Sequence, residues 1–253
     1  MGTSSVSDRA QMVKRAIRLI DLTDLADDSS AEAVEALCAE AVAQHTAAVC
    51  IWPEFVATAA RTLNGSGVMI ATVVNFPSGE ERAPAVSAAA ARAVADGADE
   101  IDVVLPWRAW MEGQTQRAAD VLDAVRAAVP PPIVVKVIIE SGELGSPVVV
   151  GDAARFAIAH GADFVKTSTG KTALSATPEA VSAILDAVSA SDRPVGVKAS
   201  GGIRKVDQAL KYLEQVDASM GEGWATPGTF RFGASGLLAA LVEEQSALLD
   251  PLR

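Results

Sequence analysis

Short apolar runs alternate with Ala-rich amphipathic segments along almost the whole chain. Apolar strands that alternate with helices typically form a parallel sheet covered by helices on both faces. The pattern therefore predicts an α/β fold. Strands are expected at 19–23, 49–52, 68–75, 101–105, 133–140, 164–166, 195–200 and 230–233. Helices are expected at about 31–44, from Pro53, at about 81–95, after Pro106 to about 128, at about 147–160, from near Thr177, at about 204–217 and at about 236–249.

Eight strand–helix units in 253 residues fit a (β/α)8 TIM barrel better than an open, doubly wound sheet. The open sheet is the alternative, and it is less favoured because no GxGxxG motif follows the first strand. Gly-Ala-Asp recurs at 97–99 and 161–163, each time just before an expected strand. No linker or low-complexity segment divides the chain, so we predict one domain over residues 1–253.

Composition and charge restrict the possible partners. Half of the residues are apolar, which is ample for a large core. Lys and Arg total 21 against 32 Asp and Glu, a formal charge of −11, so neither nucleic acid nor a membrane is expected as a partner. Cys38 and Cys50 provide no disulfide framework. With no secretory signal in residues 1–7 and no apolar run near the ~20 residues of a membrane span, a cytoplasmic location is expected.

Polar residues interrupt the apolar strands, and we expect them at the carboxyl ends, where barrels carry their chemistry. They are Asp21, Thr23, Cys50, Asn75, Asp102, Lys136, Lys166, Lys198 and Ser200. The segment Phe164-Val165-Lys166 begins as a buried strand and ends in a lysine. An unpaired buried ammonium is costly, which suggests a function for Lys166.

Two effects are expected to make Lys166 a nucleophile. Burial and a nearby second cation both lower the pKa of an amine, and Lys198 on the adjoining strand is the candidate cation. A neutral amine reacts with a carbonyl to give a carbinolamine and then a Schiff base, whose protonated imine accepts electrons from a breaking C–C bond. Asp102 is the expected proton-transfer group, directly or through a bound water.

Structural roles compete with these chemical roles. Lys136 could be a counter-ion for Asp102 or Asp21 as well as a catalytic group. Asp21 and Thr23 could simply fix the barrel mouth by hydrogen bonds. Cys50 is expected to be a small buried hydrophobe, and the two histidines, His45 and His160, are expected to have no catalytic role.

Three glycine-containing segments follow the last three expected strands, at 169–171, 201–202 and 233–235, and the first and third also contain a hydroxyl. Loops in this position commonly bind phosphate, because glycines let backbone N–H groups approach an anion. Lys171 would add a positive charge. Simple turn glycines are the alternative explanation.

The chain resembles the 2-deoxyribose-5-phosphate aldolases, which are class I (Schiff-base) aldolases, over about residues 17–241. The resemblance rests on stretches 20–23, 49–53, 71–77, 97–104, 136–144, 161–171, 197–204 and 231–235. The most specific is Lys166-Thr167-Ser168-Thr169-Gly170-Lys171.

The resemblance implies a TIM barrel that reversibly cleaves 2-deoxy-D-ribose 5-phosphate to D-glyceraldehyde 3-phosphate and acetaldehyde, in deoxyribonucleotide catabolism. It implies that Lys166 forms the Schiff base, Lys198 lowers its pKa and Asp102 transfers protons. It also implies a cytoplasmic homodimer without metal or organic cofactor. Implied pocket residues are Asp21, Thr23, Cys50, Lys136 and Thr169, and implied phosphate-binding residues are Gly170, Lys171, Gly201, Gly202, Gly233 and Ser235.

Two positions depart from the pattern of this family. Gly236 stands where many members have a second Ser, and residues 249–253 lack the C-terminal Tyr of some members. Phosphate affinity or proton-transfer rate is therefore expected to differ. Two rival functions are a barrel synthase or isomerase without covalent chemistry, and a sugar-phosphate binder without turnover.

Overall fold

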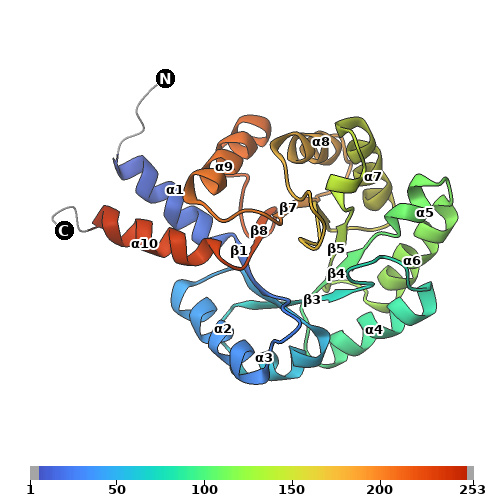
Figure 1. Ribbon diagram of the computed structural model, residues 1–253, viewed down its shortest axis with the longest axis horizontal. Helices are drawn as coiled ribbons and strands as arrows, with labels where there is room; N and C mark the ends of the chain where they lie inside the picture. Colours follow the sequence, from blue (N-terminus) through green and yellow to red (C-terminus); the bar gives the residue numbers. More distant parts are fainter. Residues whose placement is uncertain (1–5, 250–253) are drawn as a thin grey trace.

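The computed structural model describes residues 6–249, whose strands form one closed parallel barrel in the order β1 to β8 (Figure 1). Leu22 of the first strand pairs with Ala234 of the last, which closes the sheet. The (β/α)8 prediction is thus confirmed and the open sheet is wrong. The strands are β1 (Ile20–Asp24), β2 (Ala48–Ile51), β3 (Met69–Val74), β4 (Glu100–Val104), β5 (Val134–Ile138), β6 (Phe164–Lys166), β7 (Gly196–Ser200) and β8 (Phe230–Ala234).

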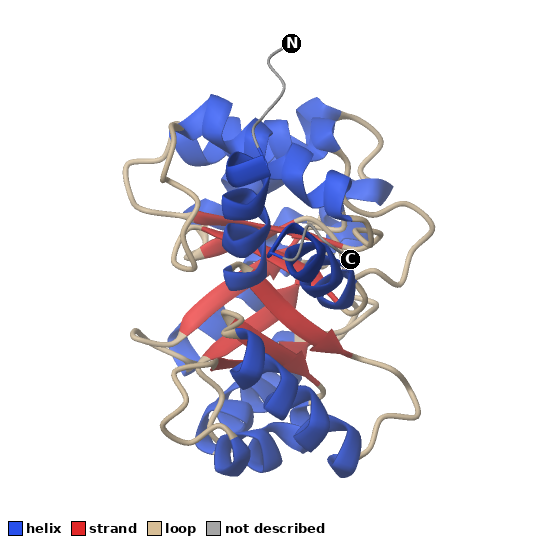
Figure 2. Ribbon diagram, turned by 90° about the vertical axis from the view of Figure 1, so that its left-hand side faces the viewer, coloured by secondary structure: helices blue, strands red, loops and turns tan. Residues whose placement is uncertain are grey.

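Helices surround the strands, so that the sheet lies between helical layers (Figure 2). The outer helices are α2 (Ala31–Gln44), α3 (Val56–Thr62), α4 (Ala83–Ala95), α6 (Thr115–Ala128), α7 (Pro147–Ala159), α8 (Pro178–Ser189), α9 (Val206–Met220) and α10 (Leu237–Leu249), with short 3₁₀ turns at η1 (Pro53–Phe55) and η2 (Ser141–Glu143). The side chains of Ser30 and Thr177 accept hydrogen bonds from the N–H groups of Ala33 and Ala180. These caps begin α2 and α8 where the sequence predicted.

One expected helix is divided in two. The segment from Pro106 to about 128 forms α5 (Trp107–Met111) and then α6, with a turn between them. Gly113 lies in that turn at φ 81°, a left-handed conformation that glycine adopts without a steric penalty. A signal for this break was present and was missed, because residues 112–117 form an uninterrupted polar and exposed run.

Helix α1 (Val6–Arg18) was not predicted at all. Its amphipathic pattern was present, because the buried residues Val13, Ala16 and Ile17 recur at helical spacing. The helix lies beside α10 and α9. Arg15 donates to both carboxylate oxygens of Asp217 at 2.6 Å, which fixes the helix against α9.

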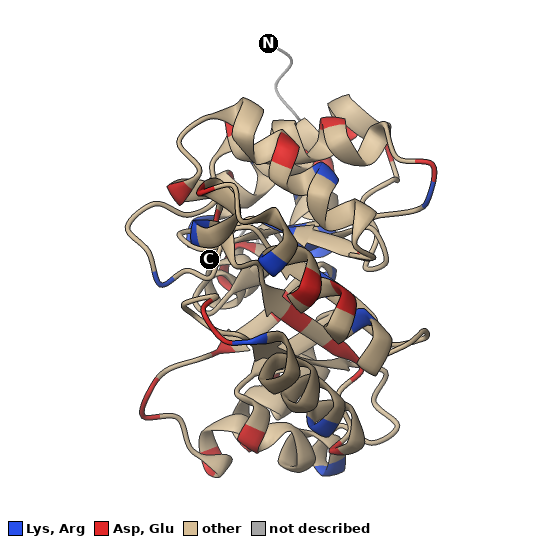
Figure 3. Cartoon of the chain, turned by 90° about the vertical axis from the view of Figure 1, so that its right-hand side faces the viewer, with Lys and Arg blue, Asp and Glu red and all other residues tan. Residues whose placement is uncertain are grey.

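The described residues include no helix that is both long and apolar enough to cross a bilayer. On the side displayed in Figure 3, acidic and basic residues are interspersed over the outer helices and loops. The single-domain prediction covers 1–253, but residues 1–5 and 250–253 lie outside the described part. The predictions of a tail without the C-terminal Tyr, at 249–253, and of no secretory signal, at 1–7, therefore fall mostly outside the described residues.

Candidate active site

Asp102 and the three lysines that contact it form a group of four charged side chains inside the barrel. One carboxylate oxygen, Oδ1, lies 2.7 Å from Lys136 Nζ. The other, Oδ2, lies 2.8 Å from both Lys166 Nζ and Lys198 Nζ. Since they share one oxygen, these two amine nitrogens are no further apart than twice that distance. The Lys166 side chain is 3% exposed and the other three are fully buried, so the amines are held away from bulk water.

A second group of charges lies against the first. Arg231 donates to Asp21 Oδ1 at 2.5 Å and to Glu100 Oε1 at 2.8 Å. Lys136 Nζ is 2.5 Å from Glu100 Oε2, and Lys198 Nζ is 2.5 Å from Asp21 Oδ2. Arg231, Lys136 and Lys198 therefore each contact two carboxylates within 2.8 Å. These contacts join the two groups of charges into one connected network.

Sequence reasoning missed Glu100 and Arg231 as members of the site. Glu100 was assigned to the turn before β4, and Arg231 to an otherwise apolar strand. A usable signal was present, because side chains alternate along a strand. Glu100 is two residues from Asp102, so both point into the barrel, and Arg231 pairs in register with Lys198.

The pKa values of the three lysines move in different directions. Burial lowers the pKa of Lys166, and the positive charge of Lys198 lowers it further. The negative charge of Asp102 raises it, but the net pKa stays below its usual value. Burial also lowers the pKa of Lys198, but Asp102 and Asp21 outweigh it and the net pKa is raised. For Lys136, Asp102 and Glu100 likewise outweigh burial, so its pKa is raised. Lys166 is thus the most easily deprotonated of these amines.

The carboxylates remain charged despite their burial. Burial raises the pKa of Asp102, but Lys136, Lys166 and Lys198 together hold it well below its usual value. The same opposition leaves the pKa of Asp21 low, with Lys198 and Arg231 as its main neighbours. Both are therefore anionic near neutral pH.

Not every polar residue lies where the sequence analysis expected it. Lys166 ends β6, as predicted. Asp21, Asp102, Lys136 and Lys198 lie inside their strands rather than at the carboxyl ends. The expectation that all polar residues gather at the mouth was wrong, because inward side chains stack in layers along the barrel axis. The network therefore lies inside the barrel, with Lys166 in register with Lys198 on the neighbouring strand.

The side of the interior formed by β2 and β3 is apolar. Cys50, Ala71, Val73 and Leu25 form a separate buried cluster, distinct from the main core. Burial raises the pKa of the Cys50 thiol, which favours the protonated form. This agrees with the interpretation of Cys50 as a small buried hydrophobe. Thr23 donates through Oγ1 to the backbone carbonyl of Asp21 at 2.8 Å. This hydrogen bond fits the structural role considered above, in which Thr23 fixes the barrel mouth.

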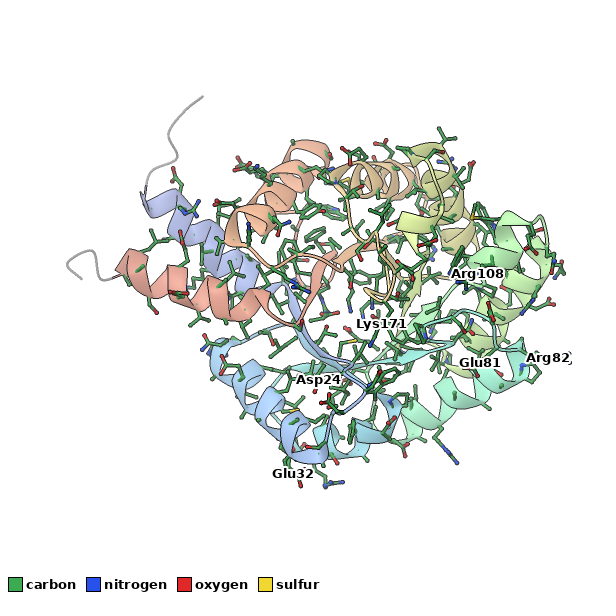
Figure 4. The ribbon with its side chains drawn as sticks, in the orientation of Figure 1. Asp24, Glu32, Glu81, Arg82, Arg108 and Lys171 are labelled. Carbon is green, nitrogen blue, oxygen red and sulfur yellow. The ribbon has the colours of Figure 1, made fainter. Side chains whose placement is uncertain are left out.

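The loop after β6 is tied to the end of β5. Thr169 donates through Oγ1 to Glu140 Oε2 at 2.6 Å, and through its backbone N–H to Oε1 at 3.2 Å. Glu140 is fully buried and was missed by the sequence analysis. Lys171 Nζ donates to the carbonyl of Leu25 at 2.9 Å, and Figure 4 shows Lys171 near the barrel centre, whereas Glu32 lies on the outer ring.

Glycines make the neighbouring loops compact. Gly170, Gly201 and Gly202 all have positive φ angles, and a Cβ on Gly201 would lie only 3.2 Å from the Cα of Gly170. The loops after β6 and β7 therefore pack closely, with backbone conformations that favour glycine. An anion-binding arrangement of this kind needs such access to backbone N–H groups.

Gly233 corrects the third predicted loop. It lies inside β8 and not after it. A Cβ there would lie 2.5 Å from Ser200 Oγ and 2.9 Å from Lys198 Cε, so the glycine makes room for the lysine. Ser235 is exposed just beyond the strand, and a side chain at Gly236 would meet open space.

The remaining candidates lie apart from this network. His45 caps α2, and His160 ends α7 and pairs with Asp123 at 2.8 Å. In residues 6–249, no group of three or more His, Cys, Asp and Glu side chains is arranged to hold a metal ion.

Comparison with known proteins assigns this barrel to a family. The model of the DeoC/LacD family aldolases matches residues 15–241. The chain belongs to this aldolase family. A deoxyribose-phosphate aldolase of Agrobacterium fabrum is 46% identical over 225 residues, covering 88% of this chain and 87% of the relative. The family resemblance found in the sequence is thus confirmed, and the protein is an enzyme of the aldolase class.

Solved structures of family members agree. One from Toxoplasma gondii, provisionally described as a deoxyribose-phosphate aldolase, superposes with a TM-score of 0.87 at 25% identity, over 97% of this chain and 98% of that one. Another from Coccidioides immitis, described in the same way, has a TM-score of 0.82 at 29% identity, over 91% and 86% of the two chains.

Proposed function

We propose that this protein reversibly cleaves 2-deoxy-D-ribose 5-phosphate to D-glyceraldehyde 3-phosphate and acetaldehyde through a Schiff base on Lys166. One observation carries the proposal: Lys166 Nζ is buried 2.8 Å from Asp102 Oδ2, beside the charged Lys198. Family membership and the Agrobacterium relative support the substrate. The surroundings of the amine support the covalent step.

The first half of the reaction forms the imine. The neutral Lys166 amine attacks the aldehyde carbon of the open-chain sugar, giving a carbinolamine. Loss of water then leaves a protonated imine. Lys198 remains charged because Asp21 and Asp102 both contact it, so it disfavours a second positive charge on Lys166. This keeps part of the amine unprotonated before the aldehyde arrives.

The second half breaks the C–C bond. The proton leaves the C3 hydroxyl, the C2–C3 electron pair moves into the imine to give an enamine, and the three-carbon aldehyde departs. The enamine carbon is then protonated, and water releases acetaldehyde and restores the amine. Asp102 contacts all three lysines, so it is suited to relay these protons.

Two features of the site suit this substrate. The apolar surface of Cys50, Ala71 and Val73 faces the same interior, where it would accommodate the two-carbon end of the sugar. At the other end, backbone N–H groups around Gly170, Gly201 and Gly202, with Ser235, would bind the phosphate. Lys171 Nζ uses one of its three N–H donors on the carbonyl of Leu25, so the others could bind the phosphate.

Reductive trapping tests the covalent step. Incubation with acetaldehyde and borohydride should add one ethyl group to Lys166, detected by peptide mass spectrometry. Lys14→Met, a change on the exposed face of α1, should leave the adduct unchanged. An unmodified Lys166 with intact cleavage activity would favour a non-covalent barrel enzyme. Sugar-phosphate binding without cleavage or adduct would favour a binding protein.

We also infer that the enzyme works in deoxyribonucleotide breakdown, in the cytoplasm and as a homodimer. The proposed substrate supports the pathway, since it is the sugar released in that breakdown. Light scattering of the purified protein tests the oligomer, and a tetramer would contradict it. A deoxyribose phosphate aldolase of Aeropyrum pernix with the same fold is described as tetrameric (TM-score 0.76, 23% identity, 98% and 100% of the two chains).

A further inference from the structure

The charges inside the barrel do not balance if every basic group is protonated. Within the connected ion-pair network, Arg231 carries a permanent positive charge and three lysines can add three more, against three carboxylates. The buried Glu140 is not part of this network, because its carboxylate accepts hydrogen bonds from Thr169 and Thr172 beyond the end of β5. The groups come from β1 and from β4 to β8, while β2 contributes the thiol of Cys50 and β3 contributes no charged residue. The members are Asp21, Glu100, Asp102, Lys136, Lys166, Lys198 and Arg231.

A net charge is costly in a buried site, so the loss of one proton is favoured. The number of carboxylate contacts decides which group loses it. Lys136 and Lys198 each contact two carboxylates within 2.8 Å, and Arg231 likewise contacts two. Among the carboxylates of residues 6–249, Lys166 contacts that of Asp102 alone. The excess charge is therefore removed most easily at Lys166.

Arg231, the cation that is always charged, lies in register with the two lysines on the strands β6 and β7. Lys166 pairs in register with Lys198, and Lys198 pairs with Arg231. Glu100 lies between Arg231 and Lys136 and offsets one charge. We propose that Arg231 and Glu100 are positioning residues that together set the protonation of Lys166 through the charge balance of the barrel interior. This inference rests on the proposed Schiff base at Lys166.

The two residues should act in opposite directions. Without Arg231, three lysines would balance three carboxylates, so Lys166 would keep its proton up to a higher pH. Without the charge of Glu100, the positive excess would grow and Lys166 would lose its proton at a lower pH. A unit charge about 10 Å away, at an effective dielectric constant of about 20, changes a pKa by on the order of one unit.

The experiment measures the pH midpoint of adduct formation on Lys166, using acetaldehyde and cyanoborohydride. Arg231→Met should move the midpoint up by about one pH unit and Glu100→Gln should move it down by about one. The double variant removes one charge of each sign and should return to the wild-type midpoint. Arg231→Lys keeps the charge and should stay close to wild type.

A purely structural role predicts a different result. Loss of a structural ion pair would lower adduct yield at every pH without moving the midpoint in opposite directions. Arg15→Met, which breaks the distant pair with Asp217, is the matched control and should leave the midpoint unchanged. Circular dichroism monitors folding, and Glu100→Gln carries the test by itself if Arg231→Met does not fold.

The outcomes separate the two proposals. Absence of an adduct in the wild-type protein would overturn the Schiff-base mechanism and this inference with it. A wild-type adduct whose midpoint stays fixed in Glu100→Gln, or moves the same way in both single variants, would overturn the inference alone.

Discussion

The two faces of the barrel strands have opposite chemistry. On the outer face, Ile101, Val103, Val137, Val165 and Val197 are fully buried and belong to one large aliphatic core under the helices. On the inner face, residues one position along the same strands are charged and equally buried. Alternation along a strand allows this, because successive side chains point to opposite sides of the sheet.

The comparison shows how the same strands can carry both the core of the fold and the charged site, because different residues of each strand do so. The outer face supplies stability, because burial of aliphatic side chains is favourable without any partner. The inner face is buried at a cost, which the ion pairs only partly offset. Changes on the two faces should therefore separate activity from stability, as the following predictions specify.

The largest effect is expected at Lys166. Lys166→Met keeps the length of the side chain but removes the nucleophile, so cleavage of deoxyribose 5-phosphate should fall by at least about 10³-fold. The melting temperature should change little, since the lost amine is the most easily neutralised cation of the network. Coupled aldehyde detection measures the rate. Substantial residual cleavage would show that another group is the nucleophile.

Lys198→Leu should be the next most severe change. Without its charge the pKa of Lys166 should rise, so that the amine stays protonated near neutral pH and the rate falls by on the order of 10²-fold. The acid limb of the pH–rate profile should move to higher pH, and part of the rate should return under alkaline conditions. A near-normal rate at pH 7 would remove Lys198 from its proposed role.

A change on the outer face should lower stability and leave activity unchanged. Ile101 lies beside Asp102 in β4 but faces the aliphatic core. Ile101→Ala should lower the free energy of unfolding by about 2–5 kcal/mol, because it removes buried methyl groups and leaves a cavity. Urea denaturation measures the loss. The kcat of the folded enzyme and its pH profile should remain near those of wild type, and a shifted profile would contradict the separation of the two faces.

The smallest effect is expected at Gly236, where a side chain meets open space. Gly236→Ser adds a hydroxyl beside Ser235 at the proposed phosphate site. One added hydrogen bond is worth about 1 kcal/mol, so KM for the phosphorylated substrate should fall about fivefold with kcat unchanged. Gly236→Ala is the control without a hydroxyl and should resemble wild type. Equal KM values in both variants would place the phosphate elsewhere.

Local signals in the sequence predicted much of the fold and part of the site. Apolar runs and caps at Ser30 and Thr177 gave most of the elements, and β6 began and ended as expected. Lys166 stood out because a lysine that ends a buried strand is unusual. The division at Gly113 and the whole of α1 were missed although local signals existed, a polar run at 112–117 and buried residues at helical spacing in α1.

Charge pairing was the part that the sequence could not reveal. Glu100 and Arg231 are 131 residues apart, yet their side chains lie 2.8 Å apart. Their contact depends on closure of the barrel and on the register of β7 with β8, which no local pattern encodes. Glu140 was missed for a similar reason, since its partner Thr169 lies on another loop.

The sequence by itself determined the alternation of strands and helices, the inward side of each strand, and the presence of three lysines and their carboxylates. Those features follow from periodicity, which is a local property of the chain. Only the tertiary structure decided which amine is left with a single carboxylate partner. That outcome depends on distances between strands far apart in sequence, and in a dry interior electrostatic interactions are strong enough for those distances to set which group gives up its proton.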